Sequence, residues 1–151
     1  MQTEELTTLI TALVPDQKPG ISKQYPEYII PLEKLHDVAK TLKENQQTKM
    51  DYLFSLTAAD RKDGLNVIYH LTSTEYHHIV VLRVILNDKE NPIVATVSDL
   101  WNAAEYFERE VFDLFGIKFE NHPDLRRLFL DDEWVGYPLR KDYKDAFIFE
   151  R

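Results

Sequence analysis

The sequence predicts an α+β fold: a mainly antiparallel sheet of about four strands covered by helices, followed by an extended irregular C-terminal segment. Three observations support this prediction. Apolar residues recur at three-and-four spacing in two stretches near the start of the chain, residues 52–86 have the aromatic and β-branched enrichment of strands, and residues from 117 onward show neither a helical nor a strand period. At 151 residues, the chain can form one domain with a modest core. We therefore expect an α+β domain over residues 1–116 and a partner-binding segment over residues 117–151 of the same single domain.

Two helices and a short strand are expected in the first fifty residues. Thr3, followed by two acidic residues, suits the start of a helix over residues 4–14, in which leucine and isoleucine form one stripe. The proline- and glycine-containing stretch 15–20 predicts a turn, and residues 28–30 are expected to form a strand. A second amphipathic helix is expected over residues 32–43, with its lysines on the opposite face from its leucines.

A three-stranded antiparallel meander is predicted between Tyr52 and Leu86, with turns at 60–64 and 73–76. Its residues are rich in aromatic and β-branched types, which favour strands. Residues 65–72 alternate so that their apolar side chains share one face. Residues 79–86 are apolar on both faces except for Arg83, so we expect that strand to lie deeper in the sheet.

A third helix is expected over residues 99–115, because Ser98 and Asp99 are typical capping residues and Gly116 tolerates a left-handed stop. Residues 117–151 then lack a regular period but contain many Phe, Leu, Trp and Tyr residues, too many for a disordered tail. Long structureless loops are uncommon in compact domains. This apolar segment is therefore predicted to lie on a partner protein.

Composition excludes several classes of function. The net charge of −8 disfavours binding to nucleic acid, and the absence of cysteine excludes disulfides, thiolate nucleophiles and Cys-ligated iron–sulfur clusters in this chain. The four glycines are too far apart for either standard glycine-rich nucleotide motif. The longest aliphatic run, residues 79–82, is too short to span a membrane, and the acidic start is unlike a signal peptide. We expect a protein made and kept in the cytoplasm.

The expected third helix carries several carboxylates beside an arginine. Arg109 lies four residues from both Glu105 and Asp113, which predicts a surface salt-bridge ladder worth about 0.3 kcal/mol per pair. The alternative is that Glu108 or Glu110 acts as a general base or a metal ligand. Sequence spacing favours the ladder but leaves both interpretations open.

No metal site is expected from the five histidines. None of them has the four-residue spacing of a zinc-protease helix, and the adjacent His77 and His78 would point to opposite faces of a strand. His122 precedes Pro123 at a turn, where a histidine ring commonly ties a loop by hydrogen bonding.

Arginines gather in the last third of the chain among acidic and aromatic residues. The planar guanidinium group pairs with carboxylates through two hydrogen bonds and tolerates partial burial better than lysine does. This mixture suits a polar network at a protein interface. The residues concerned are Arg109, Arg126, Arg127, Arg140 and Arg151.

Three motifs in this region resemble the signature of the C subunit of proton-pumping type I NADH:quinone oxidoreductase, respiratory complex I, the 30 kDa subunit family. They are residues 108–119 (EREVFDLFGIKF), residues 122–127 (HPDLRR) and residues 136–143 (GYPLRKDY). The resemblance covers most of residues 25–143, with the family's order and spacing. Two positions depart from it, because the family usually has histidine at the place of Tyr137 and proline at the place of Lys144.

The resemblance implies a non-catalytic structural subunit, with no catalytic, cofactor-binding or metal residue of its own. Such a protein packs against the D subunit near the quinone site, in the peripheral arm at the cytoplasmic face of the bacterial inner membrane, and itself does not span the membrane. FMN, iron–sulfur clusters, NADH and a quinone would be bound by other subunits, and the enzyme activity would belong to the complex. The chain looks like a stand-alone C subunit rather than a fused C–D polypeptide.

The resemblance also assigns roles to groups of residues. Four residues would fix the helix end: Glu108, Arg109, Glu110 and Asp113. Four would hold the following turn: His122, Asp124, Arg126 and Arg127. Three would bridge to the partner: Arg140, Lys141 and Asp142. The other motif residues are Gly116, Pro123, Gly136, Pro138 and Tyr143.

Two alternatives stay open. The motifs also fit the equivalent subunit of a ferredoxin-fed photosynthetic complex or a membrane-bound hydrogenase. A free hydrolase that uses Glu108 or Asp113 with His122 is the alternative from a different class of function.

Overall fold

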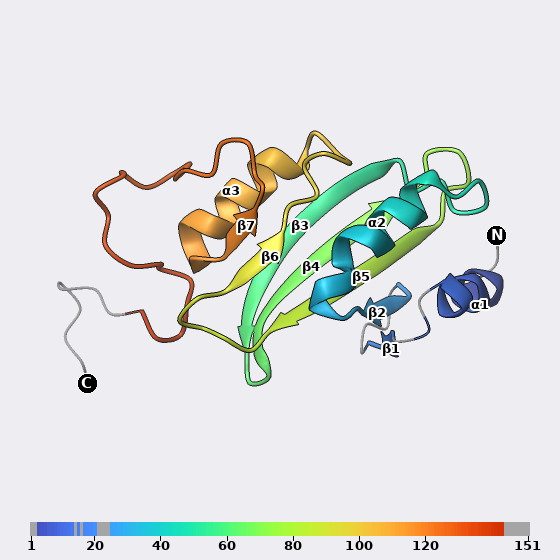
Figure 1. Cartoon of the computed structure of the whole chain (residues 1–151), viewed down its shortest axis with the longest axis horizontal. Helices are drawn as coiled ribbons and strands as arrows, with labels where there is room; N and C mark the ends of the chain where they lie inside the picture. Colours follow the sequence, from blue (N-terminus) through green and yellow to red (C-terminus); the bar gives the residue numbers. More distant parts are fainter. Residues whose placement is uncertain (1–2, 14, 16, 21–24, 144–151) are drawn as a thin grey trace.

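The computed structural model describes residues 3–13, 15, 17–20 and 25–143, and its element order is α+β, as predicted. A five-stranded sheet has the order β1-β2-β5-β4-β3, and a separate two-stranded sheet is formed by β6 and β7 (Figure 1). The strands are β1 (Lys18–Pro19), β2 (Glu27–Ile29), β3 (Tyr52–Arg61), β4 (Gly64–Thr72), β5 (Ile79–Leu86), β6 (Ile93–Ala95) and β7 (Lys118–Glu120). The helices of this described part are α1 (Thr3–Leu13), a 3₁₀ turn η1 (Leu32–Lys34), α2 (Leu35–Glu44) and α3 (Ala104–Phe115).

The predicted meander is confirmed as β3, β4 and β5, which pair antiparallel in sequence order. Val67 pairs with Val84 and Tyr69 with Leu82, so the apolar residues of β4 and β5 share one face of the sheet. These side chains are buried together with leucines of α2, which lies in front of β4 and β5 in Figure 1. Both strands are interior, since β4 lies between β3 and β5 and β5 lies between β2 and β4.

Four strand features were not predicted. The expected strand near residue 28 exists as β2, but its parallel pairing with β5 was not foreseen, the expected turn at 15–20 contains β1, and residues 93–95 form the unpredicted strand β6. Residues 118–120, expected to be irregular, form β7 and pair parallel with β6. Parallel pairing joins segments that are distant in sequence and leaves no turn motif between them.

The predicted start of the third helix is wrong. α3 begins at Ala104, not at residue 99, because the preceding residues make other contacts. The Asp99 carboxylate lies 2.8 Å from His36 Nε2 instead of capping a helix, and the Trp101 indole donates a hydrogen bond to the carbonyl of Met50. Residues 98–103 therefore form successive turns that fasten this loop to α2 and to the start of β3.

The predicted end of the third helix is confirmed. Gly116 has φ of 76°, in the left-handed region, and its N–H donates to the carbonyl of Phe112. A Cβ added to Gly116 would lie 2.5 Å from the ring of Tyr137. Glycine is required here both by the backbone conformation and by the close approach of the later chain.

No helix in the described part of the chain has both the length and the apolar character needed to cross a membrane.

Candidate functional site

The motif residues lie mainly on α3 and on the chain that follows β7, which we call the C-terminal segment (residues 121–143). In Figure 1 this orange-to-red segment leaves β7, passes around α3 and returns toward the loop between β5 and β6. It contains turns and bends but no helix or strand. Two buried carboxylates, Asp113 and Asp60, hold it at two separate points.

Asp113 is the first of these points and lies in the last turn of α3, with its side chain fully buried. Its Oδ1 accepts a hydrogen bond from Arg127 Nη1 at 3.0 Å. Its Oδ2 accepts the backbone N–H groups of Leu128, Phe129 and Leu130, at 3.3, 2.7 and 3.1 Å. Burial alone would raise the pKa of Asp113, but these hydrogen bonds to the ionised form outweigh burial and lower it.

Arg127 connects Asp113 to a second stretch of the C-terminal segment, residues 134–136. Its guanidinium donates to the carbonyls of Asp113, Trp134 and Gly136, and it lies over the ring of Tyr137, 4.9 Å from the centroid. Only 9% of its side chain is exposed. One arginine thus joins the end of α3 to two turns, which fits the fork-like geometry of its donors.

The predicted ladder on α3 is wrong. Arg109 does not bond Glu105 or Asp113; its guanidinium donates at 3.2 Å to the carbonyls of Arg126 and Arg127. The ladder was predicted on an exposed face, whereas Arg109 and Asp113 are buried. The C-terminal segment covers this face of α3 and supplies the partners.

His122 ties the turn after β7, as predicted. Its Nε2 lies 3.0 Å from the carbonyl of Glu105, and its Nδ1 accepts the N–H of Asp124. These contacts fit the ring tautomer with its proton on Nε2. Asp124 also pairs with Arg126 in an exposed ion pair, which contributes little to stability.

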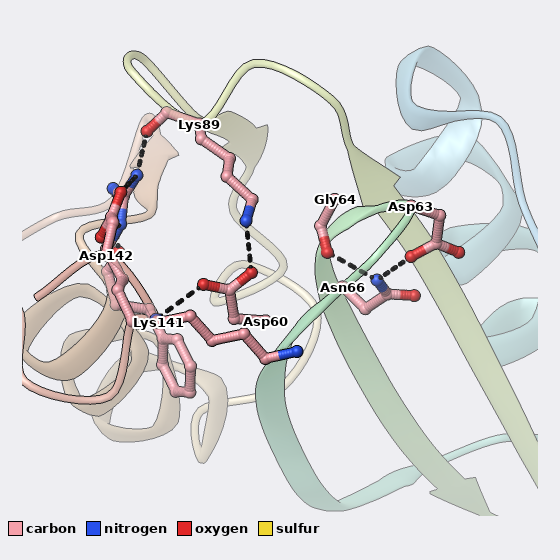
Figure 2. Close-up of polar contacts among 9 residues, drawn as sticks. Asp60, Asp63, Gly64, Asn66, Lys89, Lys141 and Asp142 are labelled. Atoms are coloured by element: carbon pink, nitrogen blue, oxygen red, sulfur yellow. Dashed lines mark hydrogen bonds and ion pairs between the residues drawn. The ribbon is translucent and has the colours of Figure 1, made fainter.

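Asp60 is the second point and lies at the end of β3, with 2% of its side chain exposed. Figure 2 shows its carboxylate between the Lys89 ammonium, at 2.6 Å, and the backbone N–H of Lys141, at 2.8 Å. Burial would raise the pKa of Asp60, but the hydrogen bonds and the positive charge of Lys89 lower it. Arg140 also fastens the segment here: its guanidinium donates a hydrogen bond to the carbonyl of Lys89 at 2.5 Å and forms an ion pair with Asp142.

Asp60→Asn is expected to loosen this second point. Lys89, whose side chain is 38% exposed, would lose its near counter-charge, and the Lys141 N–H would keep a weaker acceptor, at a total cost of about 1 kcal/mol. Hydrogen exchange should show faster exchange at residues 139–143 and unchanged exchange at residues 128–130. Asp132→Asn, at an exposed position of the same segment, serves as the control; equal effects of the two variants would contradict this assignment.

The remaining motif residues shape the path of the chain. Gly136 has φ of 90°, and a Cβ there would lie 3.0 Å from the ring of Tyr143. Pro138 follows Tyr137, and Leu139 then donates its N–H to the carbonyl of Leu114 at 3.0 Å. Pro123 lies at the wall of a surface cavity, and Glu110 is half-buried on α3.

Between the two points the segment exposes large apolar side chains. Val135 is 88% exposed and Phe129 is 66% exposed, although Asp113 accepts the N–H of Phe129 and Arg127 donates to the carbonyls on either side of Val135. Isolated exposed apolar residues are normal, but a cluster on one ordered segment is typical of an interaction surface. The exposed apolar set comprises Phe129, Trp134, Val135 and Leu139, with Tyr106 on α3.

Glu108 is buried away from this surface. Its Oε2 accepts the N–H of Val97 at 2.9 Å, its Oε1 is hydrogen-bonded to the Thr96 hydroxyl, and His122 Nε2 lies 3.9 Å from Oε1. Burial raises the pKa of Glu108 to about 7 against the opposing effect of these hydrogen bonds. The side chains of Glu108 and His122 are both fully buried, so this pair offers a substrate no access. The geometry therefore disfavours the hydrolase alternative.

Within the described residues, no three His, Asp or Glu side chains lie close enough to form a metal site. Sequence reasoning missed Asp60, Lys89 and Thr96. A pattern existed for Asp60 alone, since the two-residue period that places Leu56 and Ala58 inward also places Asp60 inward.

Comparison with known proteins supports the motif assignment. The family model described as "Respiratory-chain NADH dehydrogenase, 30 Kd subunit" matches residues 28–146. The fused NADH-quinone oxidoreductase C/D subunit of Phocaeicola vulgatus is 50% identical over 118 residues, which is 78% of this chain and 22% of that protein. The NADH-quinone oxidoreductase C subunit of Methylobacillus flagellatus is 42% identical over 118 residues, which is 72% of this chain and 60% of that protein.

A solved structure has the same fold. It is a chain from the membrane-bound sulfane sulfur reductase, an archaeal respiratory membrane complex, with a TM-score of 0.80 and 28% identity, and the match covers 95% of this chain and 86% of the other.

The chain spans about a fifth of the length of the C/D relatives and about half of the C subunit from Chloroherpeton thalassium. The family model nevertheless covers most of the chain, including all three motifs and both points at which the C-terminal segment is held. The chain therefore belongs to the 30 kDa subunit family of respiratory-chain NADH dehydrogenase.

Proposed function

We propose that this chain serves as the C subunit of an NADH-quinone oxidoreductase and docks against the D subunit through its C-terminal segment. The observation that carries the proposal is the exposed apolar set of this segment, whose backbone is held by hydrogen bonds to the buried carboxylates of Asp113 and Asp60. A preordered surface loses less conformational entropy on binding than a mobile one. Relatives in which C and D form one polypeptide support D as the partner.

In this role the chain carries no redox group. FMN, iron–sulfur clusters, NADH and a quinone would be bound by neighbouring subunits, and this chain would hold the D subunit in place within the peripheral arm at the cytoplasmic face of the bacterial inner membrane. Residues 117–151 would act as the partner-binding segment, with Arg140, Lys141 and Asp142 near the boundary between chain and partner.

A double substitution tests the docking surface. Val135→Asp with Leu139→Asp places charges at two exposed apolar positions, and we expect at least about 30-fold weaker association with the D subunit, as for loss of an interface hot spot of about 2 kcal/mol. NADH:quinone activity of the membranes should fall in parallel. Tyr52→Asp is the matched control, because Tyr52 is also exposed but lies at the start of β3. Unchanged assembly of the double variant would contradict the proposal.

A related complex is the second candidate, and one observation favours it: the structural match to a chain of an archaeal respiratory membrane complex. Affinity purification of the tagged chain from its native membrane separates the candidates. Copurification of NADH-oxidising subunits supports the first candidate, whereas copurification of a hydrogenase or sulfur-reductase large subunit supports the second.

A further inference from the structure

Glu108 has hydrogen-bond partners, but among the described residues no lysine or arginine is placed to balance a negative charge on it. Its carboxyl is fully buried between α3 and the turn that follows β6, where it contacts Val97 and Thr96. No lysine or arginine of the described residues lies within 4.0 Å of it. Ionising an unpaired carboxyl in such a site is costly, so the protonated form is favoured.

The titratable groups that face Glu108 do not compensate its charge either. His122, after β7, lies 3.9 Å away, but its Nε2–H is directed to the carbonyl of Glu105. Tyr69, on β4, is fully buried near this carboxyl, and its hydroxyl has no hydrogen-bond partner among the described residues. Asp99, in the loop before α3, is negatively charged and opposes ionisation of Glu108.

The Thr96 hydroxyl links Glu108 to the surface. Its oxygen is hydrogen-bonded both to Glu108 Oε1 and, at 2.8 Å, to the Ser98 hydroxyl. Since a hydroxyl has one proton, Thr96 donates to only one of them at a time. With Glu108 protonated, the carboxyl donates to Thr96 and Thr96 donates to Ser98; with Glu108 ionised, both donations reverse.

Ser98 is the outer end of this chain of hydrogen bonds. It lines an open surface cavity of about 670 Å³ together with Thr96, His36, Asp99 and Glu120. A proton on Glu108 can therefore exchange with solvent through two hydroxyl groups, without exposure of the carboxyl itself.

We propose that Glu108 is a proton-controlled lock on the Thr96–Ser98 turn: its hydrogen bonds to Thr96 and Val97 can form in either protonation state, but the ionised carboxyl is buried without a counter-charge, so ionisation favours detachment of the turn from α3 and hydration of the carboxylate. The lock is independent of the proposed function, because it uses no residue of the exposed apolar set. Release of the turn would free the end of β6, which precedes it.

The lock has a defined pH dependence. In the closed form the pKa of Glu108 is about 7, and an exposed glutamate has an ordinary pKa of 4.5. At a pH between these two pKa values, detachment of the Thr96–Ser98 turn releases one proton from Glu108. The equilibrium constant for this opening should therefore rise about tenfold per pH unit from about pH 5 to about pH 7. Above pH 7 the carboxyl is ionised in both forms, and the constant should become flat.

Hydrogen exchange of two amides measures this opening directly. The N–H of Val97 donates to Glu108 and that of Ser98 donates to Thr96, so both become exchangeable when the lock opens. After correction for the intrinsic exchange rate, the full chain should show the tenfold dependence per pH unit at these amides. Glu108→Gln should abolish it, because glutamine does not titrate, whereas Glu110→Gln on the same helix should retain it.

A second measurement needs no variant. The carboxyl ¹³C shift of Glu108 in the wild-type chain should titrate with a midpoint near pH 7. A midpoint near pH 4.5, or the same exchange slope in Glu108→Gln as in the wild-type chain, would overturn the proposal.

Discussion

Asp113→Asn should lower the free energy of unfolding by about 3–5 kcal/mol, because it leaves the buried Arg127 guanidinium without its counter-charge. The variant also weakens acceptance of three consecutive backbone N–H groups, those of residues 128–130. Urea denaturation followed by circular dichroism measures the change. Glu110→Gln, three residues earlier and half-buried, is expected to change stability by less than about 0.5 kcal/mol.

The pH dependence of this variant provides an independent check. The pKa of Asp113 is lower in the folded chain than its ordinary value of 3.8. Its contribution to stability is therefore complete above that ordinary value and is lost as the pH falls through the lowered folded value. The difference between wild type and Asp113→Asn should be constant at neutral pH and should shrink in acid. A loss below about 1 kcal/mol at neutral pH would contradict the role assigned to Asp113.

Glu27→Leu is expected to lower the free energy of unfolding by a comparable amount, about 3–5 kcal/mol. The ion pair that it removes lies on the face of the sheet opposite to the side chains of Tyr69 and Leu82. Glu27 Oε1 lies 2.7 Å from Arg83 Nε, and both side chains are buried, with 7% and 5% exposed. Arg83 Nη1 also donates to Asn66 Oδ1 at 2.8 Å, whereas Asp63 is 3.9 Å away. Without Glu27, the arginine on interior strand β5 would lack its near counter-charge.

A double substitution separates the loss of an ion pair from the loss of packing. Glu27→Leu with Arg83→Met removes both charges, and it should recover most of the stability lost in Glu27→Leu alone. Glu75→Gln is the exposed control, since Glu75 and Lys49 form an ion pair at 2.8 Å with 57% and 40% exposed, and its loss should change the stability far less than Glu27→Leu does. If the double variant is as unstable as Glu27→Leu, the cost does not come from the unpaired charge.

Sequence periodicity predicted the elements whose stability depends on local pattern. The alternation in residues 65–72 indicated which side chains face the core, and the structure confirms it at Leu65, Val67, Tyr69 and Leu71. The glycine stop at residue 116 was predicted because few residue types tolerate its backbone conformation. The motifs identified the family because their residues and spacing are specific.

The same reasoning failed where a distant segment supplies the partner. Glu105, Arg109 and Asp113 lie four residues apart, and this spacing shows only that they share one helix face. It does not show that the C-terminal segment covers this face. In the structure, Arg109 and Asp113 are therefore buried and contact residues 126–130 instead of forming the predicted exposed ladder. Asp60 and Lys141 are likewise joined across 81 residues of chain.

Local sequence patterns were enough to predict the α+β class, the central meander, the end of α3 and the family. The parallel pairing of β2 with β5, the two points that hold the C-terminal segment, and the burial of Glu108 with no lysine or arginine of the described residues within 4.0 Å became known only from the folded chain. The physical reason is that periodicity reports the burial of a face, which is a local average. A hydrogen bond or an ion pair depends on which individual groups the path of the whole chain brings within about 3 Å.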